Sequence, residues 1–355
     1  MKISFRTWIG FKMDLAAQVA RLYRARQPFH IVGGGTKSFL GNPADPDLPR
    51  VSTTNHEGIL AYEPAELILR ARAGTALVKI NEVLAAEGQM LGFEPPDFDG
   101  KATLGGAIAA GLSGARRPWY GAARDFVLGV GLITGEGRYL EFGGQVMKNV
   151  AGFDVSRLVT GALGTLGVIA DVSLKVLPAP ESVVSLCIPC NRQDAHRMML
   201  DLSNRSIPIS GACHSDQALW VRLSGTNEAV EAARTHGILA GAQVADTPIW
   251  KTTSNFTLKG KTLWRLSVPP SSPALLDECN VIDWGGAQRF LADPDFNPRH
   301  RLDEGHATLI RTPPAEASPE PFAELSPAVW KITRRLKQAF DPAELVNPGR
   351  LYQGL

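Results

Sequence analysis

The sequence has few cysteines, no long apolar run and almost no net charge, and each shortage excludes a class of protein. Four cysteines in 355 residues, Cys187, Cys190, Cys213 and Cys279, are too few and too unevenly spaced for a disulfide framework, which favours reduced thiols and a cytosolic setting. A formal charge of +2 provides no field of the kind that nucleic-acid-binding proteins use. No apolar run approaches the roughly 20 residues of a membrane-spanning helix.

Changes in composition divide the chain. Residues 1–13 lack the continuous apolar stretch of a secretory signal, and we expect them to be a disordered N-terminus. A Pro/Ala segment follows Pro178 and a proline-rich linker begins near residue 313. Beyond Pro178, strands alternate with helices in a hairpin-like order, which predicts an α+β fold with an antiparallel sheet. The predicted parts are a first domain over 14–178, a second domain over 181–312, and a linker, C-terminal helix and tail over 313–355.

What the sequence does contain is glycine in unusual concentration at three places. The first follows a short apolar strand, where residues 29–32 run directly into GGGTKS at 33–38. Successive backbone N–H groups in such a loop can turn toward one anion, and hydroxyl and ammonium groups add donors. The pattern is neither a Walker A motif nor G-x-G-x-x-G. It predicts a phosphate cradle, with a plain glycine turn as the alternative.

The other two glycine-rich segments also lie where helices or strands begin. Residues 103–106, TLGG, precede an alanine-rich helical turn, where small side chains let the backbone approach an anion. Gly161, Gly164 and Gly167 follow the polar KNVAGFD segment and lead into an alternating strand, VIADVSLKVL. One long ligand with a diphosphate explains the three segments more economically than three unrelated turns. The sequence therefore predicts a dinucleotide site.

Motifs in both halves of the chain carry a family resemblance. In the first half they are IVGGGTKSFLG, ATLGGAIAAGLSG followed by RPWYGAARDFVLGV, and KNVAGFDVSRLVTGALGTLGVI. In this order and at these distances they resemble the FAD-binding domain of the vanillyl-alcohol oxidase (PCMH) type. In the second half, LWRLSVPP, DWGGAQRFL, GHATLIRTP and FDPAELVNPGRLY resemble the E subunit of bacterial glycolate oxidase. The resemblance covers nearly the whole chain from about residue 14.

The resemblance implies a fold and a set of FAD contacts. The fold is a two-subdomain FAD-binding domain with a smaller α+β cap domain over the isoalloxazine. The residues that would wrap the diphosphate are Gly33, Gly34, Gly35, Thr36, Lys37 and Ser38. Those that would lie near the ribityl and diphosphate region are Thr103, Gly105, Gly106, Ser113 and Gly114. Those that would approach the adenosine end are Gly161, Gly164, Val168 and Ile169.

Two departures from related proteins bear on the chemistry. Thr36 stands where relatives with covalently bound flavin often carry histidine, so the resemblance implies non-covalent FAD. The C-terminal half also lacks the H-x-G-x-x-N-x-H pattern of larger 2-hydroxy-acid dehydrogenases. No metal site is therefore expected, and a complete substrate site in this chain is not implied.

The resemblance also implies an activity and partners. The chain would be a subunit of a glycolate oxidase (glycolate dehydrogenase) complex, in which glycolate becomes glyoxylate and electrons pass through flavin to an iron–sulfur subunit. A larger FAD subunit would complete the complex, and this cytoplasmic chain would meet the inner membrane only through its partners. Two alternatives stay open: an assembly subunit with structural FAD, and a free-standing oxidase of an alcohol or 2-hydroxy acid.

Oxidation of a 2-hydroxy acid requires a base for the hydroxyl proton and a cation for the carboxylate. The residues that act in these roles stay unassigned, because every candidate also has an ordinary structural interpretation. The candidate cations are Arg222, Arg265, Arg289 and Arg311. The candidate bases are His214, His300 and His306.

Some further residues have two interpretations. Lys148 can pair with Asp154 to order the central loop, or it can approach the flavin. Residues 117–120, with Arg117, Trp119 and Tyr120, can close over FAD or pack their own loop. Residues 283–286, DWGG, form a distinctive turn that can lie at the flavin-facing edge of the cap.

Two features are expected to be structural. Cys187 and Cys190 lack the further cysteines of an iron–sulfur site, so we expect two core thiols. The C-terminal helix is amphipathic, with Val329, Ile332, Leu336 and Phe340 on one side. Its other side carries Arg334, Arg335 and Lys337, which we expect to be solvated, with docking of an acidic partner as the alternative.

Overall fold

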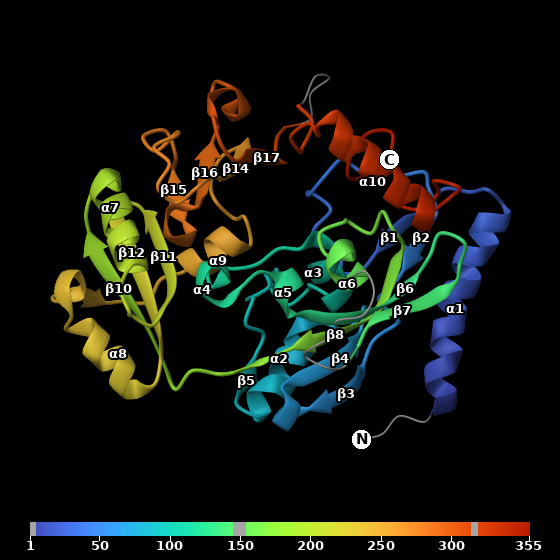
Figure 1. Cartoon of the computed structure of the whole chain (residues 1–355), viewed down its shortest axis with the longest axis horizontal. Coiled ribbons are helices and arrows are strands. Elements are labelled where there is room, and N and C mark those ends of the chain that lie inside the picture. Colours follow the sequence, from blue (N-terminus) through green and yellow to red (C-terminus); the bar gives the residue numbers. More distant parts are fainter. Residues whose placement is uncertain (1–4, 145–153, 314–318) are drawn as a thin grey trace. The chain divides into compact units, whose positions relative to one another are not determined.

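The computed structural model describes residues 5–144, 154–313 and 319–355, with side chains described from residue 14 onward. The chain divides into two compact units (Figure 1). The first comprises residues 1–112, 122–178 and 324–355, and the second comprises residues 113–121 and 179–323. The C-terminal segment, which the sequence separates from the first domain, thus returns to it, and residues 113–121 join the second unit. Residues 324–355 pack mainly within the first unit, and residues 113–121 pack mainly within the second.

Five antiparallel strands form the main sheet of the first unit, in the order β3-β4-β8-β6-β7. They are β3 (Ile59–Glu63), β4 (Ile68–Arg72), β6 (Val127–Ile133), β7 (Tyr139–Gly143) and β8 (Val168–Lys175). The strand expected after the third glycine segment is confirmed as β8, and β6 and β7 form an antiparallel hairpin that flanks it. Residues 168–174 are all buried, because β8 is the middle strand of the sheet and both of its faces are covered. An alternating sequence pattern alone predicts burial of only one face.

Short ladders and helices complete the first unit. β1 (His30–Val32) pairs in parallel with β2 (Arg50–Ser52), and β5 (Gln89–Met90) pairs with β9 (Leu177–Pro178). The helical segments are α1 (Phe5–Arg24), η1 (Pro64–Glu66), α2 (Leu77–Ala86), α3 (Leu104–Ala110), α5 (Ala123–Phe126), α6 (Val155–Val159) and α10 (Pro327–Phe340). Helix α1 begins at Phe5, within the N-terminal segment for which the sequence predicts disorder.

One eight-stranded antiparallel sheet forms the second unit, as predicted, in the order β13-β10-β12-β11-β15-β16-β14-β17. Its strands are β10 (Ser182–Pro189), β11 (Ile209–Ser215), β12 (Ala218–Gly225), β13 (Gln243–Val244), β14 (Leu263–Ser267), β15 (Val281–Asp283), β16 (Gln288–Ala292) and β17 (His306–Arg311). Its helical segments are α4 (Arg117–Tyr120), α7 (Arg192–Ser203), α8 (Asn227–Arg234), η2 (Gly237–Leu239), α9 (Ile249–Ser254), η3 (Trp284–Gly286) and η4 (Pro298–Arg301). The sequence pattern predicts neither β11 nor β16. All seven residues of β11 are buried and show no alternation.

The two faces of this sheet differ in character. Trp264, Leu266, Leu291 and Leu309 share one hydrophobic core with residues of α7 and α8. Because neighbouring residues of a strand point to opposite faces, the residues between them point away from that core. The other face combines polar side chains with buried apolar ones such as Phe290 and Leu263, and it is analysed below.

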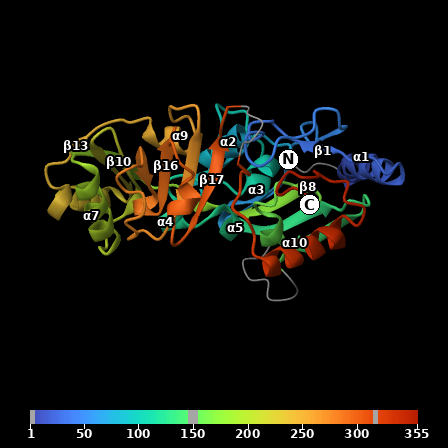
Figure 2. The ribbon, with the colours of Figure 1, turned by 90° about the horizontal axis from the view of Figure 1, so that it is seen from above.

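Helix α10 belongs to the first unit (Figure 2). Its expected apolar side is partly exposed, with Val329 46% and Ile332 57% accessible. Arg334 and Arg335 are exposed as expected, but the expectation for Lys337 is wrong, since it is only 2% accessible. Lys337 Nζ pairs with Asp341 Oδ2 at 2.8 Å and donates to two backbone carbonyls, Thr165 O (2.8 Å) and Val346 O (2.6 Å). The helix is therefore anchored to the third glycine segment by one buried ammonium group.

Replacement of Lys337 by alanine should lower the free energy of unfolding by about 3–5 kcal/mol, because it leaves Asp341 as an uncompensated buried charge. Chemical denaturation followed by circular dichroism measures this. Arg335→Ala on the same helix is the matched control and should change stability by no more than about 0.5 kcal/mol. Equal stability of the two variants would show that the pair does not hold the helix in place.

Candidate functional site

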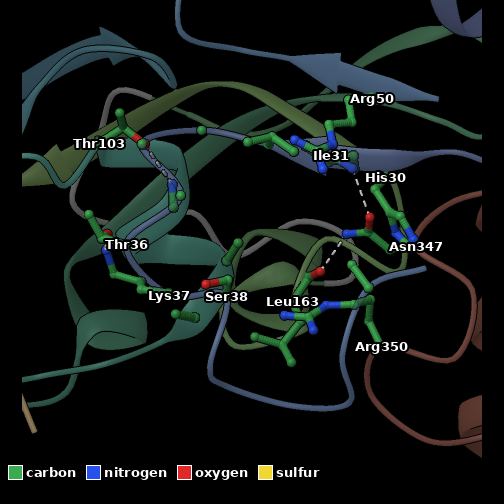
Figure 3. A pocket seen from close by; sticks show the side chains of 18 of the residues that line it. His30, Ile31, Thr36, Lys37, Ser38, Arg50, Thr103, Leu163, Asn347 and Arg350 are labelled. Atoms are coloured by element: carbon green, nitrogen blue, oxygen red, sulfur yellow. Dashed lines mark hydrogen bonds between the residues drawn. The ribbon is translucent and has the colours of Figure 1, made fainter. Parts of the chain in front are cut away.

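A cavity of about 350 Å³ opens beside the first glycine loop of the first unit (Figure 3). This volume lies within the range of sites for small organic ligands, about 300–1,000 Å³. Its lining comes from segments far apart in the sequence: residues 30–38, residues 44–50, the α3 region, Leu163 and the C-terminal tail. Residues from each of the three glycine-rich regions of the sequence thus meet at one cavity.

The triple glycine lets this loop pass against the backbone of residues 101–103. A Cβ atom at Gly34 would lie 2.0 Å from the carbonyl oxygen of Lys101, and one at Gly33 would lie 2.7 Å from Thr103 Oγ1. Gly35 has open space around it but a φ of +69°, which glycine adopts without strain. All three line the cavity and present only backbone there. Side chains at positions 33 and 34 would collide with neighbouring atoms, so glycine keeps this wall of the cavity open.

Lys37 supplies a positive charge to the same cavity. Its Nζ donates to Thr36 Oγ1 at 3.0 Å and lies 4.8 Å from the ring centroid of Phe98. Burial lowers the pKa of Lys37 from 10.5 to about 8. Within the described ranges, no carboxylate pairs with this ammonium group. A phosphate bound in the cavity would supply the missing anion and raise that pKa again.

Helix α3 presents small residues to the cavity. Thr103 caps the helix, since its Oγ1 accepts from the Gly106 N–H at 3.4 Å. A Cβ at Gly105 would lie 2.6 Å from the Cβ of Ala73, so glycine lets α3 pack closely beside β4. Ala109 and Ala110 then line the cavity without filling it.

The C-terminal tail holds the cavity wall together through Asn347. The Ile31 N–H donates to Asn347 Oδ1 at 2.8 Å, Asn347 Nδ2 donates to Leu163 O at 2.8 Å, and the Asn347 N–H donates to Phe29 O at 2.9 Å (Figure 3). Asn347 has a φ of +44°, a conformation that asparagine tolerates. Arg350 adds bonds to the carbonyls of residues 40 and 42.

His30 is the cavity residue whose polar atoms lack partners. It is 4% accessible, and neither ring nitrogen forms a hydrogen bond within the described part of the chain. Burial lowers the pKa of His30, which favours the neutral ring with one donor and one acceptor nitrogen. Sequence reasoning missed His30, Arg50, Asn347 and Arg350. The only available signal for His30 was its position in the strand before the glycine loop.

A smaller cavity of about 80 Å³ shares lining residues with the first. Gly105, Gly164 and Ile169 line it, together with Asn347. Four of the expected FAD residues line neither of these two cavities, and their roles stay predictions. They are Ser113 and Gly114, which belong to the second unit, Gly161, whose N–H donates to Ile108 O, and Val168, which lies in the core.

Three candidate carboxylate-binding arginines of the second unit already have hydrogen-bond acceptors. Arg222 Nε donates to the hydroxyl of Ser210 at 3.0 Å. The guanidinium of Arg289 donates to carbonyls of residues 272 and 274. Arg311 donates to carbonyls of residues 258 (2.7 Å) and 260 (3.0 Å). These arginines hold segments of the unit together. The fourth candidate, Arg265, donates no hydrogen bond to any described residue.

The candidate histidines are placed differently from one another. His214 is buried, and its Nε2 lies 3.2 Å from Cys190 O. His300 lies in η4, and His306 is exposed at the start of β17. No catalytic base is assigned by these positions.

The DWGG turn packs on its own unit. Trp284 Nε1 donates to Gly114 O at 3.1 Å, and the Arg117 guanidinium lies 4.5 Å from the Trp284 ring centroid. Asp154 caps α6 and pairs with Arg157 at 3.1 Å, whereas Lys148 lies outside the described residues.

The cysteines do not form a metal site. Cys187 and Cys190 are half-buried rather than core thiols, while Cys213 and Cys279 are buried. Among the residues with a described placement, no group of three or more His, Cys, Asp or Glu side chains could hold a metal ion.

Comparisons with known proteins bear on which cofactor this chain binds. Residues 12–143 match the FAD binding domain family. Glycolate oxidase subunit GlcE of Escherichia coli (strain K12) is 42% identical over 355 residues, covering 97% of this chain and 98% of the relative. A D-lactate dehydrogenase of Anaerostipes hadrus is 34% identical over 139 residues, 39% of this chain and 29% of the relative. A solved structure of alkyldihydroxyacetonephosphate synthase, 16% identical, covers 94% of this chain and 74% of its own, with a TM-score of 0.67.

The chain is therefore a flavoprotein of the vanillyl-alcohol oxidase (PCMH) fold, in the class of FAD-dependent oxidoreductases. The residues present fit the cofactor: a glycine cradle, an unpaired lysine and an orphaned buried histidine converge on one cavity. Within this class, the chain belongs to the GlcE family of glycolate oxidase subunits.

Gly34→Val should abolish FAD binding, because a side chain there collides with the Lys101 carbonyl. The flavin absorbance of the purified chain, relative to protein, measures this. Gly225→Ala is the control, since its Cβ would lie 3.5 Å or more from its neighbours, and this variant should keep full flavin content. If the Gly34→Val variant keeps the wild-type ratio of flavin to protein, the diphosphate does not bind at this loop.

FAD affinity should fall as pH rises above about 8, the pKa of Lys37 in the free chain. A bound phosphate favours the protonated ammonium, so affinity is constant below that pKa and declines by up to about tenfold per pH unit above it, until the raised pKa of the complex is reached. Fluorescence titration of the apoprotein with FAD measures the slope. Lys37→Met should flatten it, whereas Lys79→Met on the surface of α2 should not. A wild-type slope in Lys37→Met would refute the assignment.

Proposed function

We propose that this chain is the FAD-binding subunit of a complex that oxidises glycolate to glyoxylate. The observation that carries the proposal is the glycine-lined cavity, found in a chain similar over nearly its whole length to a glycolate oxidase subunit. When bound, FAD accepts the two electrons that leave the alcohol. The chain's own contribution is to hold the diphosphate through the 33–38 loop and Lys37.

FAD is bound non-covalently in this proposal. Thr36 lines the cavity, and its hydroxyl accepts a hydrogen bond from Lys37. It is not a nucleophilic imidazole of the kind that links flavins covalently. His30 offers a hydrogen-bonding ring from the opposite end of the loop, and the other expected contacts, Ser38, Thr103 and Gly106, line the same cavity.

Electrons leave through partner subunits in this proposal. An iron–sulfur subunit would receive them, because the described residues offer no cluster ligands. A larger FAD subunit related to GlcD would share the oxidation; GlcD of Bacillus subtilis (strain 168) is 34% identical over 33% of this chain. None of the helices in the described ranges is long and apolar enough to cross a membrane. The partners would provide any membrane contact.

Anaerobic glycolate should bleach the flavin absorbance of the assembled complex, and Gly34→Val in this subunit should lower turnover while assembly persists. Co-purification of the tagged chain with its partners, followed by visible spectra before and after glycolate, measures both. Full turnover by an assembled complex that has lost this flavin would make the cofactor structural. A stable chain that never co-purifies with partners, or a complex inert to glycolate, would sink the proposal.

A further inference from the structure

The face of the second unit's sheet that points away from the core carries a group of polar residues. Strands β14, β16 and β17 lie side by side (Figure 1), and their register pairs Arg265 with Thr308 and with Phe290, and Ser267 with His306. Cross-strand partners share a face. A guanidinium, an imidazole and two hydroxyls therefore project from the same side of two adjacent strands, β14 and β17, with Phe290 of β16 beside them.

Arg265 is the exception among the four candidate arginines. Its guanidinium forms no hydrogen bond or ion pair within the described residues, whereas Arg222, Arg289 and Arg311 all donate to acceptors of their own unit. It is half-buried, so an entering ligand can reach it. A guanidinium held on a strand that is paired on both sides presents its fork of donors from a fixed base.

The surroundings of Arg265 combine an apolar wall with further positive charge. Its guanidinium lies 5.9 Å from the ring centroid of Phe256, which packs edge-on against Phe290 at 6.0 Å. Burial, and then the charge of Arg117, lower the pKa of Arg265 to about 10. Partial desolvation of its ring, and then the charges of Arg265 and Arg117, also lower the pKa of His306. No carboxylate is among the charges that act on either group.

A half-buried guanidinium such as that of Arg265, without a hydrogen-bonding or charged partner among the described residues, costs free energy unless a ligand pairs with it. Backbone carbonyls accept hydrogen bonds from Arg289 and Arg311 of this unit, whereas no described group accepts one from Arg265. The planar fork of arginine matches the two oxygens of a carboxylate. The hydroxyl of Ser267, which is half-buried on the same face, suits a ligand that also carries a hydroxyl or carbonyl oxygen.

We propose that Arg265, with Arg117 and His306 nearby, forms a binding site for the carboxylate of a small 2-hydroxy or 2-oxo acid on this face of the sheet. Arg265 makes the bidentate contact, Arg117 adds long-range attraction, and the Phe256–Phe290 wall excludes water from one side. The inference deepens the proposed function and rests on it for the choice of acid. It assigns a substrate- or product-binding role to this subunit itself, although no catalytic base is assigned to it.

Oxalate is a suitable probe, because it is a two-carbon dicarboxylate that a flavin cannot oxidise. Isothermal titration of the full-length, FAD-loaded chain should show one oxalate per chain. Arg265→Gln should weaken oxalate binding at least tenfold. Arg265→Lys keeps the charge but loses the planar fork of donors, so its affinity should lie between those of the wild type and Arg265→Gln. The matched control is Arg197→Gln, an exposed arginine of α7 in the same unit, which should bind as the wild type does.

Several results would overturn the site. These are wild-type affinity in Arg265→Gln, no oxalate binding by the wild type at tens of millimolar, or equally tight binding of inorganic phosphate, which would make it a general anion site. Thermal unfolding and flavin content of each variant confirm folding of both units; should Arg265→Gln unfold, Arg265→Lys carries the test. Steady-state kinetics separate the two proposals. A raised KM for glycolate in the Arg265→Lys complex supports the site, and an unchanged KM overturns it. Oxalate binding by a complex that never oxidises glycolate sinks only the proposed function.

Discussion

Three hydrogen bonds made by Asn347, two through its side chain and one through its backbone, fix the wall of the cavity beside the first glycine loop. Asn347 connects β1, the third glycine segment at Leu163, and the C-terminal tail. Its positive φ turns the tail back toward β1, and Gly164 leaves room for its amide. Residues more than 300 positions apart therefore share one wall, as the Ile31–Asn347 separation of 316 shows. The glycine loop can stay free of side chains because neighbouring segments, and not its own packing, fix its position.

The half-buried and buried cations of the chain differ in whether the fold itself provides them with partners. Lys337 is buried but fully compensated by Asp341 and two carbonyls, and it anchors α10. Arg289 and Arg311 are likewise bonded to backbone carbonyls. Lys37 and Arg265 lack such compensation and have lowered pKa values, one in each unit. Since an uncompensated buried cation costs free energy, these two positions are the natural places for an anionic ligand.

Much of the fold follows from local patterns. The hairpin of β6 and β7, the strand after the third glycine segment, helix α7 and helix α10 are all visible as turn residues and periodicity. Strand β11 is not, because both of its faces are buried and it is rich in small residues. The charge pattern of α10 also misleads, since Lys337 appears to belong to a solvated face. Local periodicity cannot show which buried partner, here Asp341 and the tail, will cover a polar side chain.

The sequence by itself determined the chemistry of the cofactor site. Three consecutive glycines followed by Thr36, Lys37 and Ser38 are suited to a phosphate group, because backbone conformation and donor type are local properties of the chain. Only the tertiary structure decided that His30, Asn347 and Arg350 belong to the same cavity, and that Arg265 alone among four similar arginines has no acceptor among the described residues. Those facts depend on contacts between distant segments and on β-strand register, which no local pattern contains.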